Sequence, residues 1–348
     1  AMHTSDWMIS LVCDGIIAGV GGILTFIPNI LILFLALAIL EDSGYMARVA
    51  YVMDGIMGKA GLSGKAFLPM ILGFGCTVPA LMATRALETE KDRRKTMFVT
   101  PFMSCSARLP IYVLFADIFF GKAAPVACFS MYVIGLIVAI LIARMINLFD
   151  KGTNNESLLI ELPEYKKPNA KTIRIYVWNK ISDYLTKAGT TIFIASIIIW
   201  FVLNFGMGGM VENPADSFGA IIGRFMVPVL EPAGLGMWQI GVALISGISA
   251  KEVVVSSFAV LFGITNANSP EGMSLILANI RSSIPGFGSL NAFCLMLFCL
   301  LYVPCAATIG TIKKESGSVK FTLKMVMFQL LLAYAVSVLV FQLGSLLL

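Results

Sequence analysis

Long apolar runs separated by short polar and basic segments set the hydrophobic pattern of this chain. The runs cover residues 23–40, 111–142, 190–205, 290–302 and 319–348. Several approach or exceed the roughly 20 residues that an α-helix needs to cross about 30 Å of hydrocarbon. The composition agrees, because 58% of the 348 residues are apolar, 13% are charged and the mean hydropathy is +0.89. The pattern predicts an all-α polytopic membrane protein.

Two apolar segments are interrupted by residues that a lipid-facing helix does not tolerate. Residues 73–80 read GFGCTVPA, and residues 247–252 read GISAKE. Non-helical backbone at membrane depth occurs only where protein buries it or where it lines a cavity. A pair of broken segments in matching positions of two halves is typical of secondary transporters, which bind their substrate there. The two interruptions therefore predict a transporter with its site at the breaks.

Clusters of lysine and arginine predict how the chain is oriented. Most of the 25 basic residues fall within residues 41–65, 85–95, 144–187 and 313–324. The positive-inside rule places these segments in the cytoplasm, so we interpret them as topology signals and exclude nucleic-acid binding. Each half then contains a span, an interfacial helix, a broken hairpin and two further spans. The expected fold is two inverted repeats, each with a broken re-entrant helical hairpin.

The same topology divides the chain into four parts. Residues 1–22 are an N-terminal interfacial segment, and residues 23–150 form the first repeat. Residues 151–183 are a cytoplasmic linker, and the stretch from 171 to 184 has the pattern of a basic amphipathic helix on the membrane surface. Residues 184–348 form the second, inverted repeat.

Three of the seven cysteines adjoin glycine, proline or serine at a predicted break: Cys76, Cys105 and Cys305. Thiolates bind borderline transition metals well, and carboxylates bind harder ones. Together with Glu252, the three cysteines form the predicted metal site, which would hold a divalent ion weakly enough to release it. The alternative is that these cysteines are small apolar residues that pack helices closely. That alternative is favoured for the remaining cysteines, Cys13, Cys128, Cys294 and Cys299.

Charged residues at membrane depth need a polar environment, since each costs about 2.5–3.5 kcal/mol on insertion scales. Glu252 is expected on the ion path, and Lys251 either tunes it or forms a structural ion pair with it. Arg108 is expected to bind carbonyl groups freed by Pro110. We expect residues 41–43 (Glu-Asp-Ser) to cap the N-terminus of the helix that follows them. The predicted pore or gate residues are Gly75, Thr77, Pro79, Ser104 and Lys251.

Several other kinds of site are excluded. The one histidine, His3, rules out a histidine-rich metal site, and the absence of CxxC spacing argues against a disulfide framework. Residues 61–66 (GLSGKA) are not a phosphate-binding loop, because the glycine spacing is too short and no Ser or Thr follows the lysine. We therefore expect no enzyme activity, no catalytic residue and no permanently bound cofactor.

Five motifs resemble the membrane region, called Gate, of ferrous iron transport protein B, the FeoB family. They occupy residues 40–48 (LEDSGYMAR), 61–67 (GLSGKAF), 73–80 (GFGCTVPA), 103–110 (MSCSARLP) and 250–256 (AKEVVVS). The resemblance implies a bacterial inner-membrane importer of Fe(II), with two Gate repeats. It also implies that Cys76 and Cys105 are the cysteines that meet iron.

The family carries an N-terminal GTPase domain and a helical spacer, and this sequence has neither. The resemblance therefore implies the permease portion alone, with GTP acting only through the absent domain. The implied partners are the lipid bilayer, Fe(II) and that cytoplasmic GTPase domain. The basic residues 93–95 are expected to dock the GTPase domain. The sequence does not decide whether the protein forms a homo-oligomer.

Two other functions compete with iron transport. A Gate-type transporter of an organic solute, such as a nucleoside, would need a cavity lined by Asn, Gln and aromatic residues, but the broken segments are poor in Asn and Gln. A membrane scaffold that docks a partner on its basic inner face would leave the breaks unexplained. The leading prediction is the Fe(II) permease.

Overall fold

The computed structural model describes residues 8, 12, 16–149, 164–186, 190–211, 214–262, 270–283 and 287–347. The predicted N-terminal segment, apart from a few of its residues, and the first part of the linker lie outside this range. Helices make up most of the described residues. The described strands are one short antiparallel pair, β1 (Phe205–Gly206) and β2 (Gly209–Met210).

The first half of the chain is a series of helices of very different lengths. Its α-helices are α2 (Ala18–Asp42), α3 (Tyr45–Lys59), α4 (Phe67–Gly75), α5 (Thr77–Ala83), α6 (Glu90–Val99), α7 (Leu109–Phe120) and α8 (Ala124–Phe149). Single 3₁₀ turns join them at η2 (Gly64–Ala66), η3 (Thr84–Ala86), η4 (Thr100–Phe102), η5 (Ser106–Arg108) and η6 (Gly121–Ala123).

The second half is built in the same way. Its α-helices are α9 (Ala170–Tyr184), α10 (Thr190–Asn204), α11 (Phe218–Leu230), α12 (Trp238–Ser246), α13 (Val253–Leu261), α14 (Pro270–Ser283), α15 (Ser289–Leu301), α16 (Ala306–Ser316) and α17 (Val319–Leu347). Two 3₁₀ turns flank α11, η8 (Pro214–Asp216) and η9 (Glu231–Ala233).

Three segments of the described chain are long and apolar enough to cross a membrane. They are Glu90–Leu148, Ser289–Ser316 and Val319–Leu347. The number rises to five if two bent helix pairs each count as one span; these pairs bend by 86° between α2 and α3 and by 104° between α11 and α12. The protein is therefore a multi-pass membrane protein, as the hydrophobic pattern predicts.

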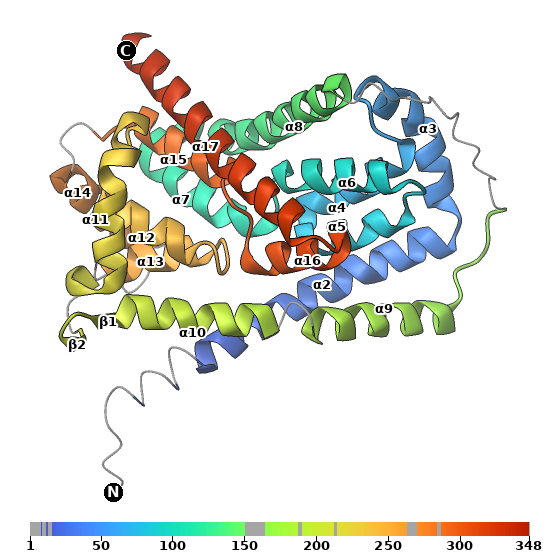
Figure 1. Ribbon diagram of the computed structural model, residues 1–348, viewed down its shortest axis with the longest axis horizontal. Coiled ribbons are helices and arrows are strands. Elements are labelled where there is room, and N and C mark those ends of the chain that lie inside the picture. Colours follow the sequence, from blue (N-terminus) through green and yellow to red (C-terminus); the bar gives the residue numbers. More distant parts are fainter. Residues whose placement is uncertain are drawn as a thin grey trace, which may run out of the picture.

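Helix α15 lies at the centre of the molecule. It packs against α7, α8 and α17, and its side chains are buried on all sides from Asn291 to Leu301 apart from one partly buried phenylalanine. A helix that is apolar around its whole circumference is typical of such a central position. Helices α9 and α10 run in succession along one side of the molecule and both contact α2 (Figure 1).

Polar side chains cap the starts of α6 and α11. The side chain of Thr89 accepts a hydrogen bond from the Asp92 amide at the start of α6, and Ser217 does the same for α11. The cap predicted at residues 41–43 is wrong. Glu41 and Asp42 form the last turn of α2, and the chain turns through Gly44, whose φ of 78° is left-handed, to begin α3.

In each half, the first of the two spans expected after the predicted hairpin is itself broken. In the first half this span is divided into α6 and α7 by non-helical residues before Cys105, and in the second half into α15 and α16 by non-helical residues before Cys305. A helix, α9, is present where the sequence predicts one at residues 171–184. Helix α14 was not anticipated, because its sequence is short and only moderately apolar.

Candidate functional site

Each of the three cysteines singled out from the sequence lies where a helix is interrupted. Cys76 separates α4 from α5 with an extended backbone (φ −151°, ψ 131°). Cys105 and Cys305 also have extended backbones, and each immediately precedes a new helical turn, η5 and α16. The break predicted over residues 73–79 is therefore confined to one residue, Cys76. Interrupted helices leave backbone carbonyl groups without helical partners, so these positions offer oxygen as well as sulfur.

In the first half, the helices on either side of Cys76, α4 and α5, pack directly on the broken span. A side-chain carbon added to Gly73 would lie 2.9 Å from Cβ of Met103, so only glycine allows this approach. The Ser106 hydroxyl donates a hydrogen bond to the Gly75 carbonyl oxygen at 2.9 Å. Ser104 is buried and shares a hydrogen bond with the Tyr112 hydroxyl at 3.0 Å. The predicted pore residues Gly75 and Ser104 thus help hold the breaks together.

Arg108 stabilises the break in this span, as the sequence predicts in outline. Its buried guanidinium donates hydrogen bonds to the carbonyl oxygen of Met103 at 3.0 Å and to that of Pro101 at 3.2 and 3.3 Å. Both carbonyls precede Cys105 in the chain. The freed carbonyls therefore belong to the residues before the break.

In the second half, the turn between α12 and α13 packs on the broken span that contains Cys305. A side-chain carbon on Gly247 would overlap the Tyr302 hydroxyl and a methyl group of Val254. The Ala306 amide donates a hydrogen bond to the Ile248 carbonyl oxygen at 2.6 Å. In both halves, then, a glycine beside a helix break approaches a residue two or three positions before a cysteine: Gly73 approaches Met103, and Gly247 approaches Tyr302.

Lys251 has a defined structural contact at this break. Its buried ammonium donates a hydrogen bond to the Val303 carbonyl oxygen at 2.5 Å and lies 3.2 Å from the centre of the Tyr302 ring. Among the described residues no ion pair joins Lys251 to Glu252. Glu252 is half-buried at the start of α13 and does not cap that helix. Lys251 therefore binds a carbonyl group two residues before Cys305, as Arg108 binds one two residues before Cys105.

The two halves meet around Cys76. Helix α5 packs on α16, and Cys76 has Cys105 and Cys305 within electrostatic range. Tyr184, at the end of α9, has Cys76, Cys305 and Glu252 within electrostatic range. Thr77 and Pro79 are buried in α5 beside them. The fold thus gathers the predicted metal residues in one region. Across the described part of the chain, however, no three His, Cys, Asp or Glu side chains form a group that could hold a metal together.

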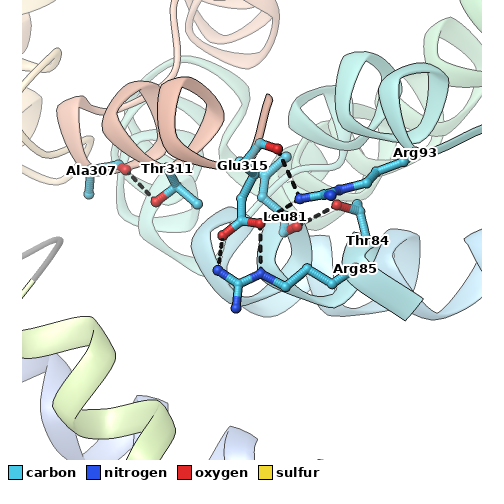
Figure 2. Close-up of polar contacts among 7 residues, drawn as sticks. All are labelled: Leu81, Thr84, Arg85, Arg93, Ala307, Thr311 and Glu315. Carbon is cyan, nitrogen blue, oxygen red and sulfur yellow. Dashed lines mark hydrogen bonds and ion pairs between the residues drawn. The ribbon is translucent and has the colours of Figure 1, made fainter. Parts of the chain in front are cut away.

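An ionic cluster that sequence reasoning missed lies at the end of α16 (Figure 2). The Glu315 carboxylate accepts hydrogen bonds from Arg85, at 2.7 and 2.5 Å, and from Arg93, at 2.8 Å. Arg93 also donates to the Glu315 carbonyl oxygen at 2.9 Å. The hydrogen bond to Glu315 raises the pKa of Arg85 above its ordinary value. Nothing in the sequence marks Glu315 as the partner of two arginines more than 200 residues earlier.

Residues 93–95 are therefore not a simple basic docking face. Arg93 is bound to Glu315, and Arg94 forms an ion pair with Glu90 at 2.7 Å. Lys95 is buried, with the Asn147 side-chain oxygen 3.5 Å from its ammonium. Charge reversal in this segment would disturb the fold as well as any docked partner.

A cavity of about 240 Å³ lies beside the Glu315 cluster. It extends from Val78, two residues after Cys76, to Glu315. The residues that line it come from α5, α9 and α16: Val78, Met82, Asp183, Tyr184, Gly310, Thr311, Lys314 and Glu315. Hydroxyl and carboxylate oxygens of this lining are ligands that divalent cations accept.

Comparison with known proteins gives two family matches. The Gate family model, described as nucleoside recognition, matches residues 23–119 and 185–319. The model described as ferrous iron transport protein B C terminus matches residues 128–180. No solved structure matches the chain significantly.

Curated relatives cover almost the whole chain. An "Fe(2+) transporter FeoB" of Staphylococcus aureus is 43% identical over 97% of this chain and 49% of its own length. One from Methanocaldococcus jannaschii is 41% identical over 99% of this chain and 51% of its own length. A fusion protein of Porphyromonas gingivalis, named for Fe(2+) transport protein A and FeoB, is 37% identical over 97% of this chain and 44% of its own length. The chain spans about half the length of the curated relatives it matches.

Proposed function

Since this chain belongs to the Gate family and matches the membrane half of FeoB-type proteins, we propose that it is the transmembrane permease of a ferrous iron uptake transporter. Its place would be the bacterial inner, or plasma, membrane. The observation that carries this proposal is the position of the cysteines: Cys76, Cys105 and Cys305 each interrupt a helix, in a chain whose relatives are named Fe(2+) transporters. Fe(II) is the transported substrate and not a resident cofactor.

The residues at the breaks take different parts in this function. Cys76, Cys105 and Cys305 offer sulfur, and Glu252 offers a carboxylate, to an ion that passes between the hairpins. Because transport requires release, a coordination shell that is never complete at one place suits this task better than a closed metal site. Backbone carbonyl groups near the breaks would supply the other ligands.

The supporting residues keep those positions in place. We assign Gly75, Thr77, Pro79 and Ser104 to the walls of the path, because they border the breaks at Cys76 and Cys105. Lys251 is assigned to positioning, since its ammonium contacts the Val303 carbonyl oxygen and the Tyr302 ring.

The proposed architecture is a pair of inverted Gate repeats, residues 23–150 and 184–348, joined by a linker at 151–183. The Gate family model matches the chain twice, once within each proposed repeat. The two halves also place a hairpin glycine against the residues before a cysteine in the same manner. If the two repeats have opposite orientations in the membrane, their hairpins enter from opposite sides and meet within it.

Two further points belong to the proposal. The curated relatives are about twice as long as the part that this chain matches, and we assign the remainder to the cytoplasmic GTPase domain that would act on this permease. Transport of a nucleoside or similar solute is not favoured, because the relatives are named Fe(2+) transporters and the C-terminal FeoB model also matches.

Uptake of Fe(II) into proteoliposomes tests the proposal. The full chain is reconstituted anaerobically, and entry of Fe(II) is followed with a chelating dye inside the vesicles. We expect Cys76→Ser and Glu252→Gln to lower the initial rate by about tenfold or more, since even the residues behind metal ligands are worth about 10–100-fold. Cys128→Ser is the matched control, because Cys128 lies within the continuous helix α8 and not at a helix break. Equal rates in all three variants and the original chain would remove the assignment of these ligands.

A further inference from the structure

Glu315 lies between two hollows of the cytoplasmic side. The inner one is the 240 Å³ cavity between α5, α9 and α16, whose lining includes Val78, two residues after Cys76. The outer one is a groove of about 610 Å³ lined by Arg85, Glu90, Arg93, Arg94, Met97, Lys314, Glu315, Ser316 and Gly317. Glu315 and Lys314 line both hollows. An ion that left the cysteines through the cavity would therefore meet the Glu315 cluster before it reached the groove.

Resting on the proposed function, we propose that Arg85, Arg93 and Glu315 form the cytoplasmic gate of the ion path. The gate is closed while both arginines bind Glu315. It opens when they leave, and the Glu315 carboxylate then becomes a ligand for the divalent cation that is moving out of the cavity.

The charge balance of the cluster supports an exchange of this kind. One buried carboxylate binds two guanidinium groups, each with a single positive charge. A buried carboxylate left alone is strongly unfavourable, so it needs a cationic partner at each stage. A divalent cation carries the same charge as the two arginines together. It can therefore replace them without leaving Glu315 uncompensated.

The exposed fractions favour the arginines over Glu315 as the partners that move. The Glu315 side chain is 2% exposed, whereas those of Arg85 and Arg93 are 45% and 29% exposed. The arginines can turn into water at little cost, while the carboxylate stays at the wall of the cavity. Figure 2 shows the two arginines approaching Glu315 from the first half of the chain, while Glu315 itself extends from α16. Because Arg85 follows the α4–α5 hairpin directly, a movement of that hairpin would pull on the gate.

The chemistry of the path changes in the direction that release requires. Sulfur ligands are available at Cys76 and Cys305, at the starts of α5 and α16, whereas the cavity lining offers the oxygens of Thr311, Asp183 and Glu315. Borderline cations such as Fe(II) are held less firmly by such oxygen ligands than by thiolates. The basic groove outside, with Arg94 and Lys314, opposes re-entry of a cation while the gate is closed.

The test uses the full chain in proteoliposomes with two measurements. The first is the rate at which a membrane-impermeant thiol reagent, added from the cytoplasmic side, labels a Thr311→Cys reporter in the cavity; the same variant without the reporter gives the background of the natural cysteines. The second is Fe(II) uptake. The gate variants are Arg85→Gln and Glu315→Gln. The control is Glu88→Gln, which removes a surface ion pair with Lys65 on the same side.

We expect both gate variants to speed reporter labelling by about threefold or more relative to Glu88→Gln. Uptake separates the two roles: Arg85→Gln should keep or raise the rate, and Glu315→Gln should lower it, because only the latter loses the ligand. Unchanged labelling in both variants overturns the gate. Equal uptake by the two variants overturns the ligand role of Glu315.

A charge swap covers the case in which a single variant fails to fold. Reversal of all three charges, with Arg85→Glu, Arg93→Glu and Glu315→Arg, restores both side-chain ion pairs, so labelling should return toward the control while uptake stays low. Faster labelling in the swap than in the control would count against the gate. If the original chain takes up no Fe(II) at all, the proposed function fails, and the ligand role fails with it. If it takes up Fe(II) but labelling never responds, only the gate fails.

Discussion

Gly247, in the turn between α12 and α13, packs tightly against the broken span that contains Cys305. A methyl group at this position would overlap the Tyr302 hydroxyl and a methyl group of Val254. Tyr302 is 3% exposed, covers the Lys251 ammonium and lies 3.4 Å from the Leu244 carbonyl oxygen, so its rigid ring has no open space to move into. Gly247→Ala therefore tests whether this turn and the span are held together as described.

Two effects oppose each other in this substitution. The backbone at Gly247 (φ −65°, ψ −9°) suits alanine, and the loss of freedom in the unfolded chain would favour the variant by about 0.4–1 kcal/mol. Overpacking a buried contact costs about 1–3 kcal/mol. The clash is the larger effect, so we expect a net loss of stability of about 1–2 kcal/mol. Displacing Tyr302 should also disturb the Lys251 contact and slow Fe(II) uptake.

The assay is thermal unfolding of the purified protein in detergent, with Gly55→Ala as the matched control. Gly55 lies in α3, where an added side-chain carbon meets nothing within 4 Å, so this variant should gain about 0.4–1 kcal/mol. We expect the Tm of Gly247→Ala to fall by a few degrees and that of Gly55→Ala to hold or rise. A Tm for Gly247→Ala equal to that of the control would refute the close contact.

Three other substitutions probe separate parts of the account. Arg108→Lys should lower stability by about 1–2 kcal/mol in the same unfolding assay, because a lysine cannot bind the carbonyls of Pro101 and Met103 together; unchanged stability would contradict this. Ser217→Ala should cost about 1 kcal/mol through the lost cap of α11 and leave Fe(II) uptake unaltered. Cys305→Ser should slow uptake by about tenfold or more, whereas Cys299→Ser should not, since Cys299 is buried within α15; equal effects would argue that neither is a ligand.

The elements that the sequence predicts well are those set by local pattern. Helices α8 and α17 follow from long apolar runs, and α9 follows from its basic amphipathic pattern. The interruption at Cys76 follows from its glycine and proline neighbours, although the structure confines it to one residue. Such signals act over a few residues, so one sequence is enough to detect them.

Contacts between distant parts of the chain could not be predicted in this way. Lys251 binds a carbonyl 52 residues later, and Arg85 binds a carboxylate 230 residues later. In both cases the partner is chosen by how the helices pack, and no local pattern encodes that choice. For this reason the sequence predicts an ion pair between Lys251 and the adjacent Glu252, and it predicts that Arg93 is available for docking.

The central claim is that a passing Fe(II) ion meets the cysteines at the helix breaks, and locating iron in the loaded protein tests it most directly. Crystals of the full chain, grown and loaded with Fe(II) without oxygen, can be measured by anomalous scattering at the iron edge. We expect an iron peak bordered by Cys76, Cys105 and Cys305, and its loss or marked weakening in Cys76→Ser. A peak elsewhere in the membrane region, or one of equal strength in Cys76→Ser, would contradict the claim.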